Sequence, residues 1–196
     1  MKPEAARTPR RSAWATGAAV AALVLPLAAC SAGDATPNAG EPRTQLVYAT
    51  GDGEPSCLDP HVGGNYPQAL LASQVLESLV ARDAAGDIVP WLASSWQVSA
   101  DGLEWEFTLR EDAAFSDGTP VDAAAVQANI AHLQDPETGS STGYLAVRQI
   151  TTVEVVSDRV VRFTLTRPDA ALLESLAQPW VAMQSPAGLA RGAEEN

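Results

Sequence analysis

Residues 96–110 read WQVSADGLEWEFTLR, and this stretch decides the class of fold. Apolar and polar residues alternate after the Asp101-Gly102 pair. Four apolar side chains thereby share one face of the second run: Leu103, Trp105, Phe107 and Leu109. A period of two predicts a strand with one buried face, and Asp-Gly between two such runs is a strong signal of a hairpin turn. We therefore expect a β-hairpin that turns at 100–102.

A second hairpin is expected over 152–166, with its turn at Ser157-Asp158. Apolar residues at helical spacing predict a helix over 68–82. Two acidic residues are suited to cap further helices, Asp122 before 123–133 and Asp169 before a helix that ends near 177. Hairpins mixed with helices, without a strict strand-helix repeat, indicate an α+β fold.

Loops are expected where turn-forming residues gather. Residues 51–67 (GDGEPSCLDPHVGGNYP) and 135–143 (DPETGSSTG) are rich in Gly, Pro, Asp and Ser. A first strand is expected over 45–50, directly before the first of these loops.

The N-terminus is typical of an export signal. Four basic residues precede an apolar stretch over 13–29 that is at the short limit for a bilayer span. Leu27-Ala28-Ala29-Cys30 resembles the bacterial lipobox, in which the cysteine receives a diacylglyceryl group. We expect a lipoprotein signal peptide over 1–29 and a lipid on Cys30; ordinary cleavage near Ala29 is the alternative.

Residues 30–45 are poor in apolar side chains and are expected to be a flexible tether between the lipid anchor and a globular part. The whole chain carries a formal charge of −12, and its single lysine is Lys2. An acidic surface of this kind argues against nucleic acid as a partner.

Eight short motifs occur in a fixed order over about 130 residues. They are Leu58-Asp59-Pro60, Glu77-x-Leu79, Pro90-x-Leu92-Ala93-x-Ser95-Trp96, Asp101-Gly102, Phe107-x-Leu109-Arg110, Phe115-x-Asp117-Gly118-Thr119-Pro120, the run 161–168 and Ser185-Pro186. In this order they resemble the N-terminal part of the family 5 extracellular solute-binding proteins. These are peptide- and nickel-type receptors of ATP-binding-cassette (ABC) importers.

The resemblance implies the N-terminal part of a two-lobed fold of the periplasmic-binding-protein type. It implies that 46–76 begin lobe one, that 77–184 form an inserted α+β domain, and that 185–196 start the return to lobe one. Family members are much longer, so the chain is expected to be a fragment whose second lobe is absent.

The resemblance also implies that the loop after Leu-Asp-Pro lines a ligand cleft. We therefore expect Gly64, Asn65, Tyr66 and Gln68 to contact a ligand, with Tyr144 as a weaker candidate. Glycine lets the backbone approach a ligand closely, and Tyr66 offers an aromatic wall with a polar tip. The alternatives are that the glycines only relieve a turn, that Tyr66 packs on the next helix, and that Tyr144 is a surface aromatic.

Catalysis and metal binding are not expected. Ser56, Asp59 and His61 are close in sequence, but three neighbours in one loop do not supply the geometry of a catalytic triad. His132 is expected on a helix as a surface or capping residue, and two histidines with one spare thiol give no metal-ligand pattern. Trp91, Trp96 and Trp105 are expected in the core. Cys57 is left open between a disulfide and a free thiol.

The sequence thus predicts a non-catalytic, lipid-anchored receptor without a cofactor. It would capture a peptide or similar solute outside the cytoplasm and deliver it to an ABC permease in the membrane. The alternative is a surface lipoprotein module that signals or adheres without transport. An exported hydrolase acting through Ser56 and His61 is a third, disfavoured hypothesis.

Overall fold

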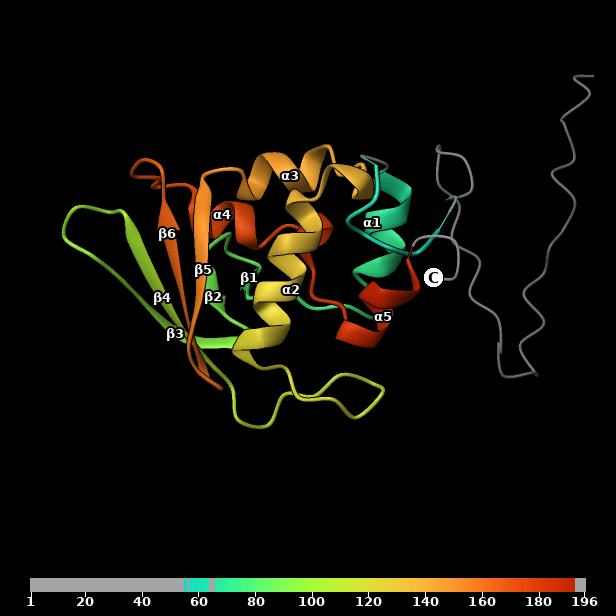
Figure 1. The fold of residues 1–196 in the computed structure, drawn as a ribbon, viewed down its shortest axis with the longest axis horizontal. Coiled ribbons are helices and arrows are strands. Elements are labelled where there is room, and N and C mark those ends of the chain that lie inside the picture. Colours follow the sequence, from blue (N-terminus) through green and yellow to red (C-terminus); the bar gives the residue numbers. More distant parts are fainter. Residues whose placement is uncertain (1–54, 56, 64–65, 193–196) are drawn as a thin grey trace, which may run out of the picture. The chain divides into compact units, whose positions relative to one another are not determined.

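The computed structural model describes residues 55, 57–63 and 66–192, which belong to one compact unit over 48–196 (Figure 1). The expected signal peptide, the tether, Cys30 and the strand over 45–50 lie outside the described residues. No helix within the described ranges is long and apolar enough to cross a membrane.

A four-stranded antiparallel sheet forms one side of the fold. Its strands are β3 (Ala93–Val98), β4 (Glu104–Leu109), β5 (Ile150–Ser157) and β6 (Val160–Leu165), in the order β3-β4-β6-β5. Both expected hairpins are confirmed, since β3 pairs with β4 and β5 pairs with β6. Gly102 adopts a φ of 72° in the first turn, a left-handed conformation that favours glycine.

The alternation of apolar residues places the core on one face of this sheet. Trp105, Phe107 and Leu109 on β4 are buried, and the ring centroids of Phe107 and Phe163 lie 5.2 Å apart. Helix α2 (Ala123–Gln134) stands beside the sheet and contacts β5 and β6 (Figure 1). Asp122 caps it as expected, its Oδ1 accepting a hydrogen bond of 2.8 Å from the Ala125 amide.

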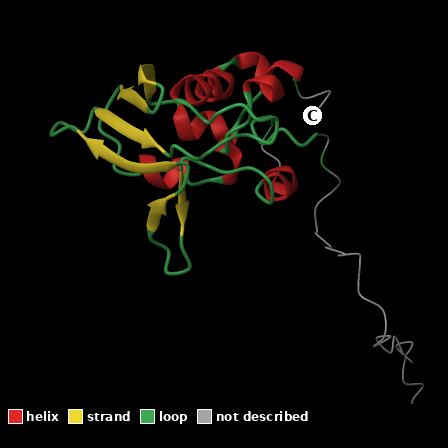
Figure 2. Cartoon of the chain, turned by 90° about the horizontal axis from the view of Figure 1, so that it is seen from below, coloured by secondary structure: helices red, strands yellow, loops and turns green. Residues whose placement is uncertain are grey.

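The remaining helices are short, and Figure 2 shows most of the helices gathered to one side of the strands. In chain order they are α1 (Tyr66–Ala72), the 3-10 turn η1 (Pro136–Thr138), α3 (Thr142–Val147), α4 (Leu172–Leu176), the 3-10 turn η2 (Pro179–Val181) and α5 (Pro186–Arg191). The mixed helix-and-sheet character predicted from the sequence is confirmed.

The helix expected over 68–82 is wrong beyond Ala72. Helix α1 ends there, and the chain enters a second, two-stranded sheet of β1 (Val80–Arg82) and β2 (Ile88–Pro90). Leu79 and Val80 are fully buried in this arrangement. A short apolar run satisfies helical and strand periods alike, and here burial in the core selects the strand.

Three further expectations need correction. Residues 135–143 are not loop throughout, because η1 forms within them and α3 begins at Thr142. Asp169 accepts from the Ala171 amide at 2.9 Å, but α4 starts only at Leu172. Trp91 is exposed rather than in the core, because it follows β2 outside the alternating run, whereas Trp105 is buried and Trp96 is half-buried.

Candidate functional site

The expected ligand loop connects Asp59 to α1. Gly64 and Asn65 lie outside the described residues. Tyr66 begins α1 with 59% of its surface exposed, so it is available to a partner. Gln68 differs from expectation: it is buried, and its Nε2 donates to the backbone oxygens of Asp59 and Val62. Its amide therefore holds the loop in shape rather than facing a cleft.

The fold brings this loop next to the second candidate segment. Gly63 adopts a φ of 69°, and its carbonyl oxygen accepts from the Ser141 amide at 3.1 Å and from the Ser141 hydroxyl at 3.0 Å. Ser141 directly precedes α3, on which Tyr144 is exposed. The two segments thus share one region of the surface, although 78 residues separate Gly63 from Ser141.

Beneath the loop lies a set of side chains that we call the polar junction: Asp59, His61, Asn129, His132 and Gln184. All are buried except His132, which is partly exposed. Oδ1 of Asp59 accepts two hydrogen bonds of 2.8 Å, one from the His61 amide and one from Nε2 of Gln184. Oδ2 of Asp59 is buried without a hydrogen-bond partner among the described residues and lies 3.9 Å from Nε2 of His132.

Asn129 joins α2 to the chain segment that follows η2. Its Nδ2 donates to the Ala125 oxygen at 2.9 Å and to the Gln184 oxygen at 2.8 Å. Its Oδ1 accepts from the Gln184 amide at 2.8 Å. Both backbone groups of Gln184 are therefore satisfied by one side chain, as buried peptide groups require.

The hydrogen bonds assign the protons on His61. Its Nε2 lies 2.8 Å from the Ala182 oxygen, and a carbonyl can only accept, so Nε2 carries the hydrogen. Burial lowers the pKa of His61 from its usual 6.5 to about 4, against the opposing effect of Asp59. The ring is thus neutral at pH 7, and its Nδ1 presents a lone pair to Nδ1 of His132, 3.0 Å away.

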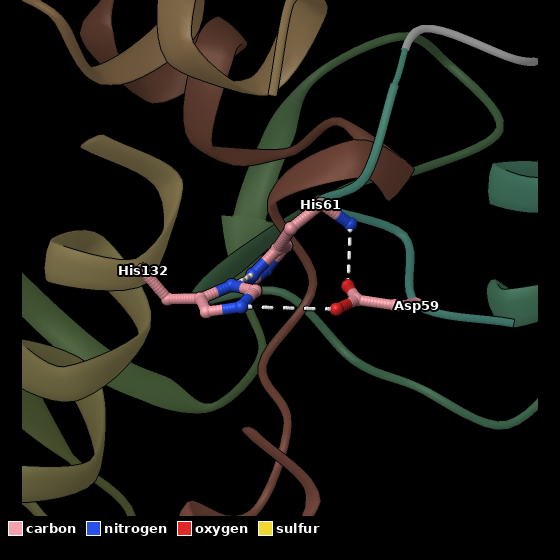
Figure 3. A group of neighbouring side chains, drawn as sticks. All are labelled: Asp59, His61 and His132. Carbon is pink, nitrogen blue, oxygen red and sulfur yellow. Dashed lines mark hydrogen bonds and ion pairs between the residues drawn. The ribbon is translucent and has the colours of Figure 1, made fainter. Parts of the chain in front are cut away.

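His132 therefore differs from the expected surface or capping residue. It lies on α2 with only 20% of its side chain exposed and faces both His61 and Asp59 (Figure 3). Spacing could not reveal this group, because 71 residues separate the two histidines. A usable signal was Asn129, a polar residue on the apolar stripe of α2, since buried polar residues imply partners.

Among the described residues, the contacts of His61 differ from those of a triad base. The Nε2 of His61, the nitrogen opposite the one that faces His132, is taken up by the Ala182 backbone. Ser56 lies outside the described residues. Cys57 is buried and has no disulfide partner within the described ranges.

A pocket of about 680 Å³ is lined in part by Gln184 of the polar junction. Leu58 and Val75 line it and are 53% and 80% exposed, respectively. Phe115 and Met183 contribute further apolar surface, and Arg110 contributes charge. Apolar side chains of this size around a hollow indicate a surface that contacts something else.

Sequence comparisons agree with the fold. Residues 87–195 match the middle region of the bacterial extracellular solute-binding proteins, family 5. The chain is similar to the nickel-binding periplasmic protein of Escherichia coli strain K12, with 39% identity over 123 residues, 62% of this chain and 23% of that protein. The glutathione-binding protein GsiB of the same strain is 33% identical over 138 residues, 70% of this chain and 27% of GsiB.

Solved structures show the same relationship. The binding protein AgaA from A. tumefaciens R10, in complex with agropinic acid, matches with a TM-score of 0.65 and 34% identity, over 71% of this chain and 28% of AgaA. The murein tripeptide binding protein MppA of Escherichia coli matches with a TM-score of 0.66 and 28% identity, over 72% of this chain and 31% of MppA.

The matched part of the chain spans between 23% and 31% of the length of these four proteins. The expected part of a periplasmic-binding-protein fold is thus confirmed, and the expectation of a non-catalytic protein agrees with relatives that are named for binding. The match over 87–195 covers more than half of the sequence. The chain therefore belongs to the bacterial extracellular solute-binding proteins of family 5.

Proposed function

We propose that this chain is the N-terminal part of a lipid-anchored, extracytoplasmic receptor that captures a peptide or a similar solute for an ABC importer. The observation that carries the proposal is the family match over 87–195, on a chain whose fold matches solute-binding proteins. Peptide-type binding is supported by the likeness to MppA and to GsiB, and nickel binding by the protein that is 39% identical.

The proposed domain boundaries are supported by a contact between the two ends of the inserted segment. The Met183 amide donates to the Glu77 oxygen at 2.8 Å, so the chain enters and leaves the domain over 77–184 side by side. Domains inserted into a host typically have adjacent ends. Residues 46–76 and 185–196 would then belong to lobe one.

We assign the pocket around Leu58 and Val75 to packing with the remainder of lobe one. The relatives are about four times longer than the matched region, so a large body of protein is available to cover it. The ligand would instead contact the loop through Gly64, Asn65 and Tyr66, with Tyr144 at its edge. Gln68 would support that loop from below.

The test compares solute binding by the chain alone with solute binding by the complete gene product. Enclosure between two lobes supplies most of the affinity in such receptors. We expect calorimetry with a mixed di- to pentapeptide library to show binding by a complete two-lobed protein and none by residues 31–196. Tight binding by residues 31–196 alone would refute a two-lobed capture mechanism.

The anchor and the permease are tested separately. The mass of the native product extracted from membranes should include a diacylglyceryl group, and Cys30→Ser should abolish it. A pull-down from membrane extract should recover a permease. Recovery of another surface protein without any permease would favour adhesion or signalling instead.

A further inference from the structure

Three groups that can donate lone pairs to a metal ion converge in the polar junction (Figure 3). They are a carboxylate oxygen of Asp59 and one ring nitrogen each of His61 and His132, and these three atoms lie within 4.8 Å of one another. We propose that these three residues bind a divalent transition-metal ion of the Zn²⁺ type. The proposal is independent of solute capture and concerns a different set of side chains.

The protonation pattern is the first argument. With hydrogen fixed on Nε2 of His61, its Nδ1 accepts, and Nε2 of Gln184 lies 3.4 Å from it. Nδ1 of His132, 3.0 Å away, donates to it in the tautomer of His132 that carries its hydrogen on Nδ1. Nε2 of that His132 is then bare, and it faces the carboxylate oxygen Oδ2 of Asp59 across 3.9 Å. Two facing lone pairs repel each other unless a group that attracts both lies between them, such as a bridging water, a proton or a metal ion. An ion that also takes the lone pair of His61 Nδ1 would replace the hydrogen bond between the two histidines.

Burial is the second argument. Asp59 is 1% exposed, and its Oδ2 has no hydrogen-bond donor among the described residues. A buried carboxylate is costly unless it is paired or coordinates a metal. His132, at 3.9 Å, is too far to donate a hydrogen bond to Oδ2. The lone pairs of Oδ2 are therefore not used by any hydrogen bond among the described residues and can coordinate a metal ion.

The distances are the third argument. Two ligands about 2.1 Å from a tetrahedral ion lie about 3.4 Å apart. One candidate ligand atom from each of Asp59, His61 and His132 lies within 4.8 Å of the other two, so small side-chain rotations bring the three atoms to this spacing. His132 is the most exposed of the three, with 20% of its side chain open to solvent, so its ring is the one with most freedom to rotate toward the other two ligands.

The groups behind the ligands suit this role. Metal-binding histidines usually donate their other N–H to a carbonyl or carboxylate, and His61 does so to the Ala182 oxygen. Oδ1 of Asp59 is held by Nε2 of Gln184 and by the His61 amide, which orients Oδ2 toward the histidines. Two imidazoles and a carboxylate favour Zn²⁺ or Ni²⁺ over Ca²⁺ or Mg²⁺.

The test uses the full chain, purified in detergent and stripped with a chelator, with Zn²⁺ as the probe. The sequence contains only two histidines, so every imidazole signal in a ¹⁵N spectrum reports on this site. We expect one equivalent of Zn²⁺ to shift both imidazoles and to raise the melting temperature.

Three substitutions remove one ligand each while conserving other bonds. His61→Gln retains a donor toward Ala182, Asp59→Asn retains the Oδ1 acceptor, and His132→Gln alters a side chain that is 20% exposed. Loss of a supporting group alone weakens metal binding by about 10- to 100-fold, so each should weaken Zn²⁺ binding by at least about tenfold. Glu137→Gln, which changes an exposed carboxylate beyond the end of α2, should leave the affinity unchanged.

Some results would overturn the proposal. Excess Zn²⁺ that leaves both imidazoles of the wild-type chain unshifted would do so without any variant. Zn²⁺ binding that survives all three substitutions but is lost in Cys57→Ala would also overturn the proposal, because the thiol would then be the ligand. An imidazolium signal from His132 at pH 7 that does not respond to Zn²⁺ would show that a proton neutralises Asp59. Circular dichroism of each stripped variant separates misfolding from loss of a ligand.

Discussion

Replacing Asn129 by alanine should destabilise the chain by about 3 kcal/mol. The side chain is fully buried and makes both hydrogen bonds of the Gln184 backbone, at 2.8 Å each. Each buried group that loses its partner costs about 1–3 kcal/mol, and alanine recovers up to about 0.7 kcal/mol of helix propensity. The third bond, to the Ala125 oxygen, adds little because that carbonyl lies within the helix.

Urea unfolding followed by circular dichroism measures this loss. The midpoint should fall while the slope with denaturant stays constant, because the surface exposed on unfolding is nearly unchanged. Gln127→Ala is the matched control: it removes an amide from the same helix, but from an exposed position that bonds only to the Val153 oxygen. Surface changes of this type stay within about 0.5 kcal/mol.

The reasoning fails if Asn129→Ala costs no more than Gln127→Ala. Equal costs would mean that water or a shifted backbone satisfies Gln184 as well as Asn129 does. Asn129→Asp sharpens the test. It retains the acceptor for the Gln184 amide but places an oxygen opposite the Gln184 oxygen, so we expect it to be at least as costly as alanine.

Three other perturbations have expected outcomes. Gly143→Ala should destabilise the chain by about 1–3 kcal/mol in thermal melts, because the added Cβ would lie 2.5 Å from Cδ2 of Leu133. Asp122→Ala should cost about 1 kcal/mol through loss of the bond to the Ala125 amide, and Asp122→Asn should retain most of that stability. In the presence of a chelator, the free energy of unfolding should fall by about 1.4 kcal/mol per pH unit as the pH drops from 6.5 toward 4. The cause is His61: its pKa is lowered in the folded chain, so the unfolded chain binds the proton more readily. His61→Gln should lack this component in pH-dependent urea unfolding, and an unchanged slope would contradict the assignment.

The sheet was predictable because its signals are local. In WQVSADGLEWEFTLR the alternation and the Asp-Gly turn specify strand, face and register within 15 residues, and Trp105, Phe107 and Leu109 are buried as expected. The helix over 68–82 failed because its apolar residues fit two periods. Only the tertiary contacts of Leu79 and Val80 decide between them, and a sequence window does not contain those contacts.

Apart from the signal that Asn129 gave, the polar junction was not predictable, for a related reason. Its members come from three segments, with 71 residues between the histidines and 55 between Asn129 and Gln184. Each alone has an ordinary explanation: a loop aspartate, a loop histidine, a helix histidine. Whether these residues form one site depends on which nitrogen faces which oxygen, and only the fold determines that.

The junction lies where the proposed receptor would need rigidity. Asp59 and His61 come shortly before Tyr66, while Ala182 and Gln184 are on the segment that leaves the proposed inserted domain. The contacts of Asp59 and His61 thus hold the start of the ligand loop against both α2 and that segment. A loop fixed in this way meets its solute with less conformational entropy left to lose, which favours affinity. An ion or proton that tightens the junction should therefore slow hydrogen exchange at the Val62 and Gly63 amides, even where no solute is present.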